Sequence, residues 1–260
     1  MRVPIYQVDA FTSELFSGNP AAVCILDQWP DEGRLKAIAA ENNLSETAFL
    51  VRHDNSFELR WFTPITEVSL CGHATLASAF VIFNMMKYQG DVILFQTRSG
   101  ILSVKRQGDL FEMDFPAQPP SRQNAPDQLQ RALKARPVTV LGTMQMLMAV
   151  LDDEATVRDL EPVFSILAQF PQRGTIVTAA GTRSDFVSRY FAPQLGVPED
   201  PVTGSSHCVL TPFWADRLGK KRLHALQLSK RGGELFCEDR GERVTIAGKA
   251  VLYLDGMITI

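Results

Sequence analysis

Two short segments of this 260-residue chain have nearly the same sequence, and this internal repeat limits the fold more than any other feature. The segments are Arg60–Pro64, which reads RWFTP, and Arg189–Pro193, which reads RYFAP. Each is followed shortly by a glycine that opens a predicted helix, Gly72 in the first half and Gly204 in the second. A match this short could arise by chance, but the same order of predicted strands and helices surrounds both copies. The repeat therefore predicts a chain built from two similar halves.

The predicted boundary between the halves is a polar, proline-rich stretch over residues 116–127. It separates an N-terminal half, residues 1–117, from a C-terminal half, residues 118–250. Within the second half, the sequence pattern over residues 156–168 predicts a single helix. The expected fold class is α+β, with two pseudo-symmetric domains.

Composition and charge exclude several classes of protein. The formal net charge is -3 and the chain contains no run of Lys or Arg, so we expect no nucleic-acid partner. No apolar stretch reaches the roughly 18 residues of a membrane span, and the N-terminus lacks the apolar core of a signal peptide. The four cysteines form no CxxC pair, and a chain of this length needs no disulfides to fold. These features predict a cytoplasmic protein without a membrane partner.

The two predicted helix starts indicate a site for an anion. A helix start leaves backbone N–H groups unpaired and carries partial positive charge, so it attracts carboxylates, and glycine allows a close approach. If the halves pack about a pseudo-twofold axis, Gly72 and Gly204 face each other across a cleft. Such a cleft could hold a small carboxylic acid and stabilise enolate-like charge without a metal or cofactor. The alternative is that both glycines only turn a strand into a helix.

Four polar residues near these helix starts are candidates for the chemistry. Glu46 lies between a polar turn and an apolar strand, where a partly desolvated carboxylate could transfer protons, or it could be a capping or surface residue. His73 could shuttle a proton, hydrogen-bond a substrate, or only belong to the helix start. Asp200 could satisfy backbone donors, or orient His73 or a polar group of the substrate. Ser205 could offer its hydroxyl to a substrate or only cap the second helix.

Cys71 needs separate consideration because cofactor-free racemases use pairs of thiolates. A cysteine in such a place is more often a small buried hydrophobe, and its counterpart in the second half is Thr203, so the two-thiol arrangement is incomplete. His207 and Cys208 adjoin but have no further ligands nearby in the sequence, so we expect no metal site. Asn19 is interpreted as a turn residue that could also contact a substrate.

Several motifs together resemble the phenazine-biosynthesis isomerase (PhzF-like) family, a branch of the diaminopimelate-epimerase-like fold. The resemblance runs nearly from end to end of the chain. It rests on Val8–Thr12 (VDAFT), Gly18–Ala21 (GNPA), Ser45–Phe49 (SETAF), Phe62–Pro64 with Glu67 and Val68, Cys71–Thr75 (CGHAT) and Glu199–Ser205 (EDPVTGS).

The resemblance implies two domains, each a β-barrel-like sheet around a central helix, with final strands near 251–260 that complete the first domain. It also implies a homodimer, with the active site between the domains. In the phenazine branch a glutamate moves a proton within a dihydro-hydroxyanthranilate ring, and Glu46 occupies that motif position. Further residues fall on the substrate-pocket positions of the family, namely Gly72, His73, Asp200, Gly204 and Ser205. The epimerase branch carries a cysteine in each half, of which only Cys71 is present here.

Three functions stay open at this point. The first is a cofactor-independent isomerase that moves a proton within a small, cyclic carboxylic acid by Glu46 in the inter-domain cleft. The second is an epimerase or racemase-like enzyme that uses Cys71, against which the missing second thiol argues. The third is a catalytically silent protein that binds a small carboxylate, against which the intact Glu46, His73 and Asp200 argue.

Overall fold

The structure is a computed structural model that describes residues 2–53 and 56–260. The chain forms two compact units, each with its own strands, helices and apolar core. Unit 1 consists of Met1–Asp114 together with Ala247–Ile260, and unit 2 is Phe115–Ile246. Among the described residues, no helix is long and apolar enough to cross a membrane.

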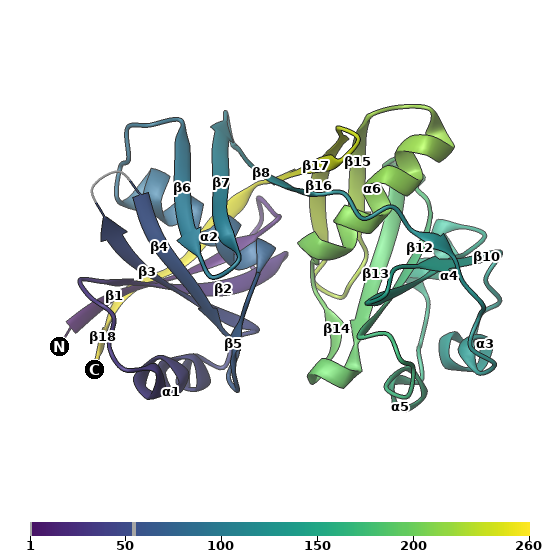
Figure 1. Ribbon diagram of the computed structural model, residues 1–260, viewed down its shortest axis with the longest axis horizontal. Helices are drawn as coiled ribbons and strands as arrows, with labels where there is room; N and C mark the ends of the chain where they lie inside the picture. The colour runs from purple at the N-terminus through teal and green to yellow at the C-terminus, as the bar shows by residue number, and fades with distance from the viewer. Residues whose placement is uncertain (1, 54–55) are drawn as a thin grey trace. The chain divides into compact units, whose positions relative to one another are not determined.

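Unit 1 is built on a mixed sheet. Its strands are β1 (Arg2–Ala10), β2 (Asn19–Leu26), β3 (Glu46–His53), β4 (Ser56–Phe62), β5 (Glu67–Val68), β6 (Val92–Thr97), β7 (Gly100–Gln107), β8 (Leu110–Pro116) and β18 (Ala250–Thr259). Pairing places them in the order β18, β1, β2, β3, β4, β6, β7, β8, with β5 beside β4. The pairs β2–β3 and β4–β6 are parallel and the others are antiparallel. Because β18 pairs with β1, the two ends of the chain lie side by side (Figure 1).

Helix α1 (Glu32–Asn42) packs on one face of this sheet, through a core cluster that includes Phe49 and Val51 of β3. Its start is capped by Asp31, whose side chain accepts a hydrogen bond from the N–H of Arg34. Side chains alternate between the two faces of a strand, so the even-numbered residues of β3, beginning with Glu46, point to the opposite face.

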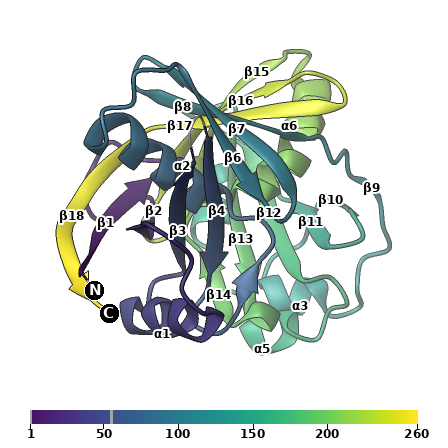
Figure 2. The same cartoon turned by 60° about the vertical axis from the view of Figure 1, so that its left-hand side comes forward.

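Helix α2 (Gly72–Phe80) is the central helix of unit 1 and packs against β1, β2 and β3 (Figure 2). Seven of its nine residues are buried. Small side chains such as Ala74 and Ala77 allow the strands to come close on several sides. The apolar segment continues beyond α2 as a π-helical turn, η1 (Val81–Met85).

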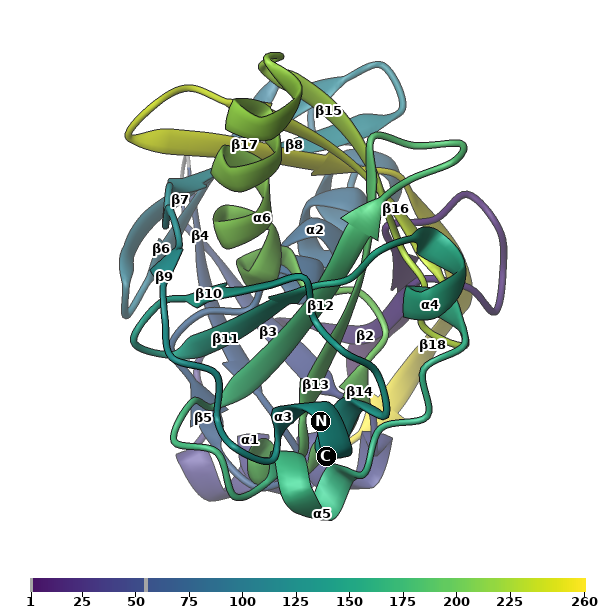
Figure 3. The ribbon, with the colours of Figure 1, turned by 90° about the vertical axis from the view of Figure 1, so that its right-hand side faces the viewer.

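Unit 2 is also a mixed sheet with helices. Its strands are β9 (Ser121–Arg122), β10 (Thr139–Gly142), β11 (Met146–Val150), β12 (Gly174–Ala180), β13 (Phe186–Ala192), β14 (Val197–Asp200), β15 (Arg222–Gln227), β16 (Gly233–Asp239) and β17 (Arg243–Gly248). Its helices are α3 (Leu129–Leu133), α4 (Glu154–Arg158), α5 (Phe164–Leu167), the 3-10 turn η2 (Pro193–Leu195) and α6 (Gly204–Leu218). Helix α6 packs against β15 and β16 (Figure 3).

The single helix predicted over residues 156–168 is wrong. The structure has two short helices there, α4 and α5, separated by a segment that contains Pro162. Proline disfavours a helical conformation of the residue before it and supplies no N–H. The guanidinium of Arg189 provides a second reason, because its Nη1 donates to the carbonyl oxygens of Val157, Arg158 and Leu160. These carbonyl groups are held by a side chain instead of a continuing helix.

The two units pair their strands in the same order. The parallel pair β2–β3 corresponds to β11–β12, the antiparallel pair β3–β4 to β12–β13, and the parallel pair β4–β6 to β13–β15. The repeated arginines make the same contacts in each unit: Arg60 binds Glu67 and Arg189 binds Glu199, each through two hydrogen bonds. Each guanidinium also lies 5.1 Å from the ring centre of the phenylalanine two residues later. The sequence repeat thus corresponds to a repeated local structure.

Candidate active site

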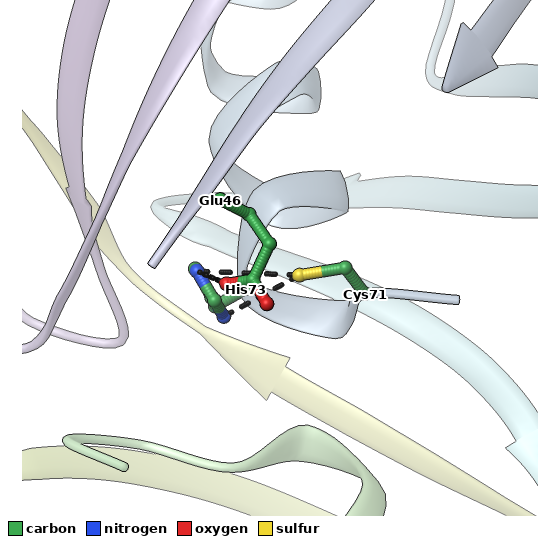
Figure 4. Close-up of side chains that lie close together, drawn as sticks. All are labelled: Glu46, Cys71 and His73. Carbon is green, nitrogen blue, oxygen red and sulfur yellow. Dashed lines mark hydrogen bonds and ion pairs between the residues drawn. The ribbon is translucent and has the colours of Figure 1, made fainter. Parts of the chain in front are cut away.

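Three side chains with different chemistry meet in unit 1. They are Glu46, the first residue of β3, Cys71, the residue before α2, and His73 in the first turn of α2. Figure 4 shows them converging, with dashed lines from the ring of His73 to the carboxylate of Glu46 and to the sulfur of Cys71. The predicted candidates Glu46, Gly72 and His73 are therefore brought together by the fold of one unit.

Local structure explains why these side chains meet. The alternation along β3 turns Glu46 away from α1, and α2 lies on that face. His73 is in the first turn of α2, and its ring reaches Glu46, the residue at which β3 begins. The side chain of His73 is 6% exposed and that of Glu46 is 18% exposed, so the carboxylate is accessible while the imidazole is enclosed.

Glu46 and His73 form a close polar pair. The Oε2 atom of Glu46 lies 3.2 Å from Nε2 of His73, which can donate its hydrogen to the carboxylate. On the other side of the ring, Nδ2 of the buried Asn19 lies 3.1 Å from Nδ1. The Asn19 amide can donate to a neutral ring or, after turning over, accept from a protonated one. The sequence interpretation of Asn19 as mainly a turn residue missed this contact, which depends on the packing of α2 against β2.

Burial affects the protonation of Cys71 and His73 differently. Burial raises the pKa of the Cys71 thiol, and the negative charge of Glu46 raises it further, so the sulfur is protonated at neutral pH. Burial alone would lower the pKa of His73, but Cys71 and Glu46 favour the imidazolium and the net pKa is raised well above its ordinary value.

The starts of α2 and α6 are alike in their backbone. Glycine is the first residue of each helix, Gly72 and Gly204, and both preceding residues are extended. The side chains of the two preceding residues, Cys71 and Thr203, make no capping hydrogen bond to these helices. The first N–H groups of both helices are therefore donors of the kind that bind anions.

The remaining predicted residues form a second cluster, in unit 2. The Oδ2 atom of Asp200 accepts a hydrogen bond of 2.5 Å from Thr203, and Gly204 and the exposed Ser205 begin α6. Gln227, at the end of β15, joins this cluster although no sequence motif marked it. Its Oε1 accepts from the N–H of Thr203 at 2.9 Å and its Nε2 donates to the carbonyl of Asp200 at 2.8 Å. Gln227 is fully buried and fixes the segment that leads into α6.

The side chains that could bind a metal ion together lie in unit 1. Within the described chain, Glu46, Cys71 and His73 form a group whose potential ligand atoms all lie within 4.8 Å of one another. His207 and Cys208 are not part of such a group. The Nδ1 atom of His207 lies 2.8 Å from the carbonyl oxygen of Thr203, and burial lowers the pKa of His207 to about 4.

Comparison with known proteins agrees with the resemblance found in the sequence. The model of the family described as "Phenazine biosynthesis-like protein" matches residues 8–256. A Pseudomonas aeruginosa protein named as an uncharacterized isomerase is 55% identical over 258 residues, which cover 99% of both chains.

Solved structures show the same relationship. A crystal structure of a phenazine biosynthesis protein of the PhzF family from Enterococcus faecalis is 45% identical, covers 100% of both chains and superposes with a TM-score of 0.98. A hydroxyproline epimerase from Agrobacterium vitis shares the fold at 9% identity, with a TM-score of 0.64 and coverage of 99% of this chain and 92% of that one. The predicted family, whose curated members include proteins named isomerases, is confirmed. The chain belongs to the phenazine biosynthesis-like family.

Proposed function

We propose that the protein is a cofactor-independent isomerase that moves a proton within a small, cyclic carboxylic acid, with Glu46 as the acid/base. The observation that carries this proposal is the pairing of the Glu46 carboxylate with His73 at 3.2 Å, beside an uncapped helix start. A carboxylate held in one orientation and partly open to solvent can both take and return a proton. The relatives named isomerases support the reaction class.

The proposed reaction has two steps on one base. First, the C–H bond beside the substrate's carboxyl or carbonyl group breaks, the proton forms an O–H bond on Glu46, and the electron pair spreads into an enolate-like system. The N–H groups at the start of α2, the helix that carries the His73 partner of Glu46, stabilise this charge. Second, Glu46 returns the proton to another carbon of the same ring. His73 keeps the carboxylate in place throughout and is a hydrogen-bond donor to it.

The second part of the proposal concerns unit 2. Asp200, Gly204 and Ser205 would bind the same substrate molecule, in a cleft between two pseudo-symmetric domains. Its support is the second uncapped helix start and the network through Gln227 that fixes it. The homodimer and the cytoplasmic location stay predictions.

Epimerisation through Cys71 is the second candidate, and one observation favours it: the Sγ atom lies 3.6 Å from Nδ1 of His73, within reach for proton exchange. Two observations oppose it. The raised pKa of Cys71 keeps the thiol protonated, and the corresponding residue of unit 2 is Thr203, which offers no second thiol. Inversion at carbon usually needs a base on each face, so the one-base isomerase agrees better with these residues.

The test is a screen of small cyclic carboxylic acids in D₂O, followed by NMR for loss of the C–H signal. The wild-type protein is expected to exchange at least one compound. Glu46→Gln keeps the side-chain shape but removes the titrating group, so it should lose about 10²–10⁴-fold in rate. Glu41→Gln, an exposed carboxylate on α1, is the matched control and should keep the wild-type rate. An active Glu46→Gln protein would refute the assignment.

A further inference from the structure

The Glu46–Cys71–His73 cluster carries a second chemical property besides proton transfer. It presents one carboxylate oxygen, one sulfur and one imidazole nitrogen, and these three kinds of atom are the usual protein ligands of Zn²⁺. The cluster is largely enclosed, since Cys71 is 7% exposed and His73 is 5% exposed. Bulk water therefore competes weakly for an ion held there.

The distances within the cluster are close to those of a tetrahedral site. With bond lengths of about 2.3 Å to sulfur and about 2.0–2.1 Å to nitrogen or oxygen, neighbouring ligand atoms lie about 3.3–3.6 Å apart. The observed separation is 3.2 Å between Oε2 of Glu46 and Nε2 of His73. The Sγ atom of Cys71 lies 4.0 Å from Nε2 of His73 and 3.6 Å from Nδ1. Small side-chain movements would bring Oε2, Nε2 and Sγ around one ion.

The residue behind the imidazole also suits metal binding. A histidine that binds metal through one nitrogen usually donates its other N–H to a neighbouring acceptor, which orients the ring. Asn19 lies 3.1 Å from Nδ1 of His73, and its amide can present oxygen there by turning over. Three protein ligands leave a fourth position for water or a small anion, as in open zinc sites.

We infer that Glu46, Cys71 and His73 bind a thiophilic divalent cation of the Zn²⁺ type, and that this ion inhibits the protein. Binding replaces the S–H bond of Cys71 by an S–metal bond and the N–H bond at Nε2 of His73 by an N–metal bond, and both protons are released to water. The hydrogen bond from Nε2 of His73 to Glu46 is lost, because both atoms then face the ion. The inhibition rests on the proposed function, since the ion would occupy the carboxylate that transfers the proton, but the binding does not.

The test uses Co²⁺ as a spectroscopic substitute for Zn²⁺ on the intact, metal-stripped protein. One equivalent of Co²⁺ should produce a thiolate-to-cobalt charge-transfer band in the near ultraviolet, and Zn²⁺ should remove it. Cys71→Ser should abolish this band, whereas Cys208→Ser, which changes a buried cysteine outside the cluster, should keep it. A wild-type protein without the band, or a Cys71→Ser protein with it, would overturn the inference.

A second measurement addresses the other ligands and the possibility that Cys71→Ser fails to fold. Zn²⁺ affinity is measured by competition with a coloured chelator. We expect losses of at least about tenfold for Glu46→Gln and His73→Gln, and about 10–100-fold for Asn19→Ala, which removes the supporting group. Affinity should rise with pH because the thiol must lose its proton. Unchanged affinities would contradict the site, while leaving the deuterium-exchange test of Glu46 unaffected.

Discussion

The first turns of α2 and α6 begin in the same way, but the two units surround them with different side chains. The register of the β3–β4 and β12–β13 strand pairs shows which residues of the two units are equivalent. Thr47 lies opposite Phe62 in unit 1 and Thr175 lies opposite Phe191 in unit 2, so the residue before each threonine is equivalent. Unit 1 has a glutamate at that position, and unit 2 has Gly174.

The glycine in unit 2 is not simply an empty position. A Cβ atom on Gly174 would overlap the hydroxyl end of Tyr190, the residue that corresponds to Trp61 in the repeated motif. Burial, followed by the charge of Asp200, raises the pKa of Tyr190 to about 12, so this phenol stays protonated at neutral pH. Unit 2 therefore places a neutral hydroxyl where unit 1 places a carboxylate. On the proposed function, unit 1 transfers the proton and unit 2 supplies polar contacts.

Removing the arginine that binds a glutamate in each unit, Arg189 in unit 2 or Arg60 in unit 1, should have the largest effect on stability. Arg189→Met removes two bonds to Glu199 and leaves three carbonyl groups without their donor, so we expect the free energy of unfolding to fall by about 3–5 kcal/mol. Arg60→Met should cost less, because Arg98 also pairs with Glu67. Denaturant titration measures both values. Equal losses would mean that the carbonyl contacts of Arg189 and the pairing of Arg98 with Glu67 do not make the two arginines unequal.

The buried histidines of the two units should respond oppositely to acid. Burial lowers the pKa of His207 to about 4, below its unfolded value, so the unfolded chain binds more protons as the pH falls. This group should cost about 3 kcal/mol of stability between about pH 7 and about pH 4. His207→Gln should flatten the dependence of unfolding free energy on pH. His73, whose pKa is raised, contributes stability that is present below its ordinary pKa and is lost as the pH rises, so His73→Gln should change the pH dependence only on the alkaline side and leave the acid loss in place.

Adding a side chain at Gly174 tests whether Tyr190 occupies the place that Glu46 has in unit 1. Gly174→Ala should lower the free energy of unfolding by about 1–3 kcal/mol, because the new methyl group overlaps Tyr190. In a Tyr190→Leu background the same change should cost much less, since the shorter side chain leaves room. A double-mutant cycle measures this coupling, and a cost that is the same in both backgrounds would show that Tyr190 does not fill the position.

The smallest effect is expected at Cys71. Serine differs from cysteine only in having oxygen in place of sulfur. The thiol has no proton-transfer role in the proposed mechanism. We expect Cys71→Ser to cost less than about 1 kcal/mol and to keep most of the isomerase rate. A folded but inactive Cys71→Ser protein would favour the epimerase mechanism instead.

Sequence reasoning was most successful where a motif is continuous. Cys71 and His73 are two residues apart at a helix start, and the pattern around Glu46 marks the beginning of a strand, so these positions could be predicted before the contact between the side chains was known. Gln227 could not be found in this way, because it reaches Thr203 from 24 positions along the chain. The broken helix at 156–168 also depends on a distant residue, Arg189, whose guanidinium binds the carbonyl groups between α4 and α5.

The most direct test of the one-base account follows a label within the substrate. Once an active compound is found, it is prepared with deuterium at the carbon that loses the proton, and the reaction is run in ordinary water. A single glutamate that accepts and returns the same nucleus predicts that part of the deuterium appears on the new carbon, and that Glu46→Gln lowers both turnover and transfer by about 10²–10⁴-fold. Turnover by Glu46→Gln at the wild-type rate, together with wild-type product that carries no deuterium, would contradict the central claim.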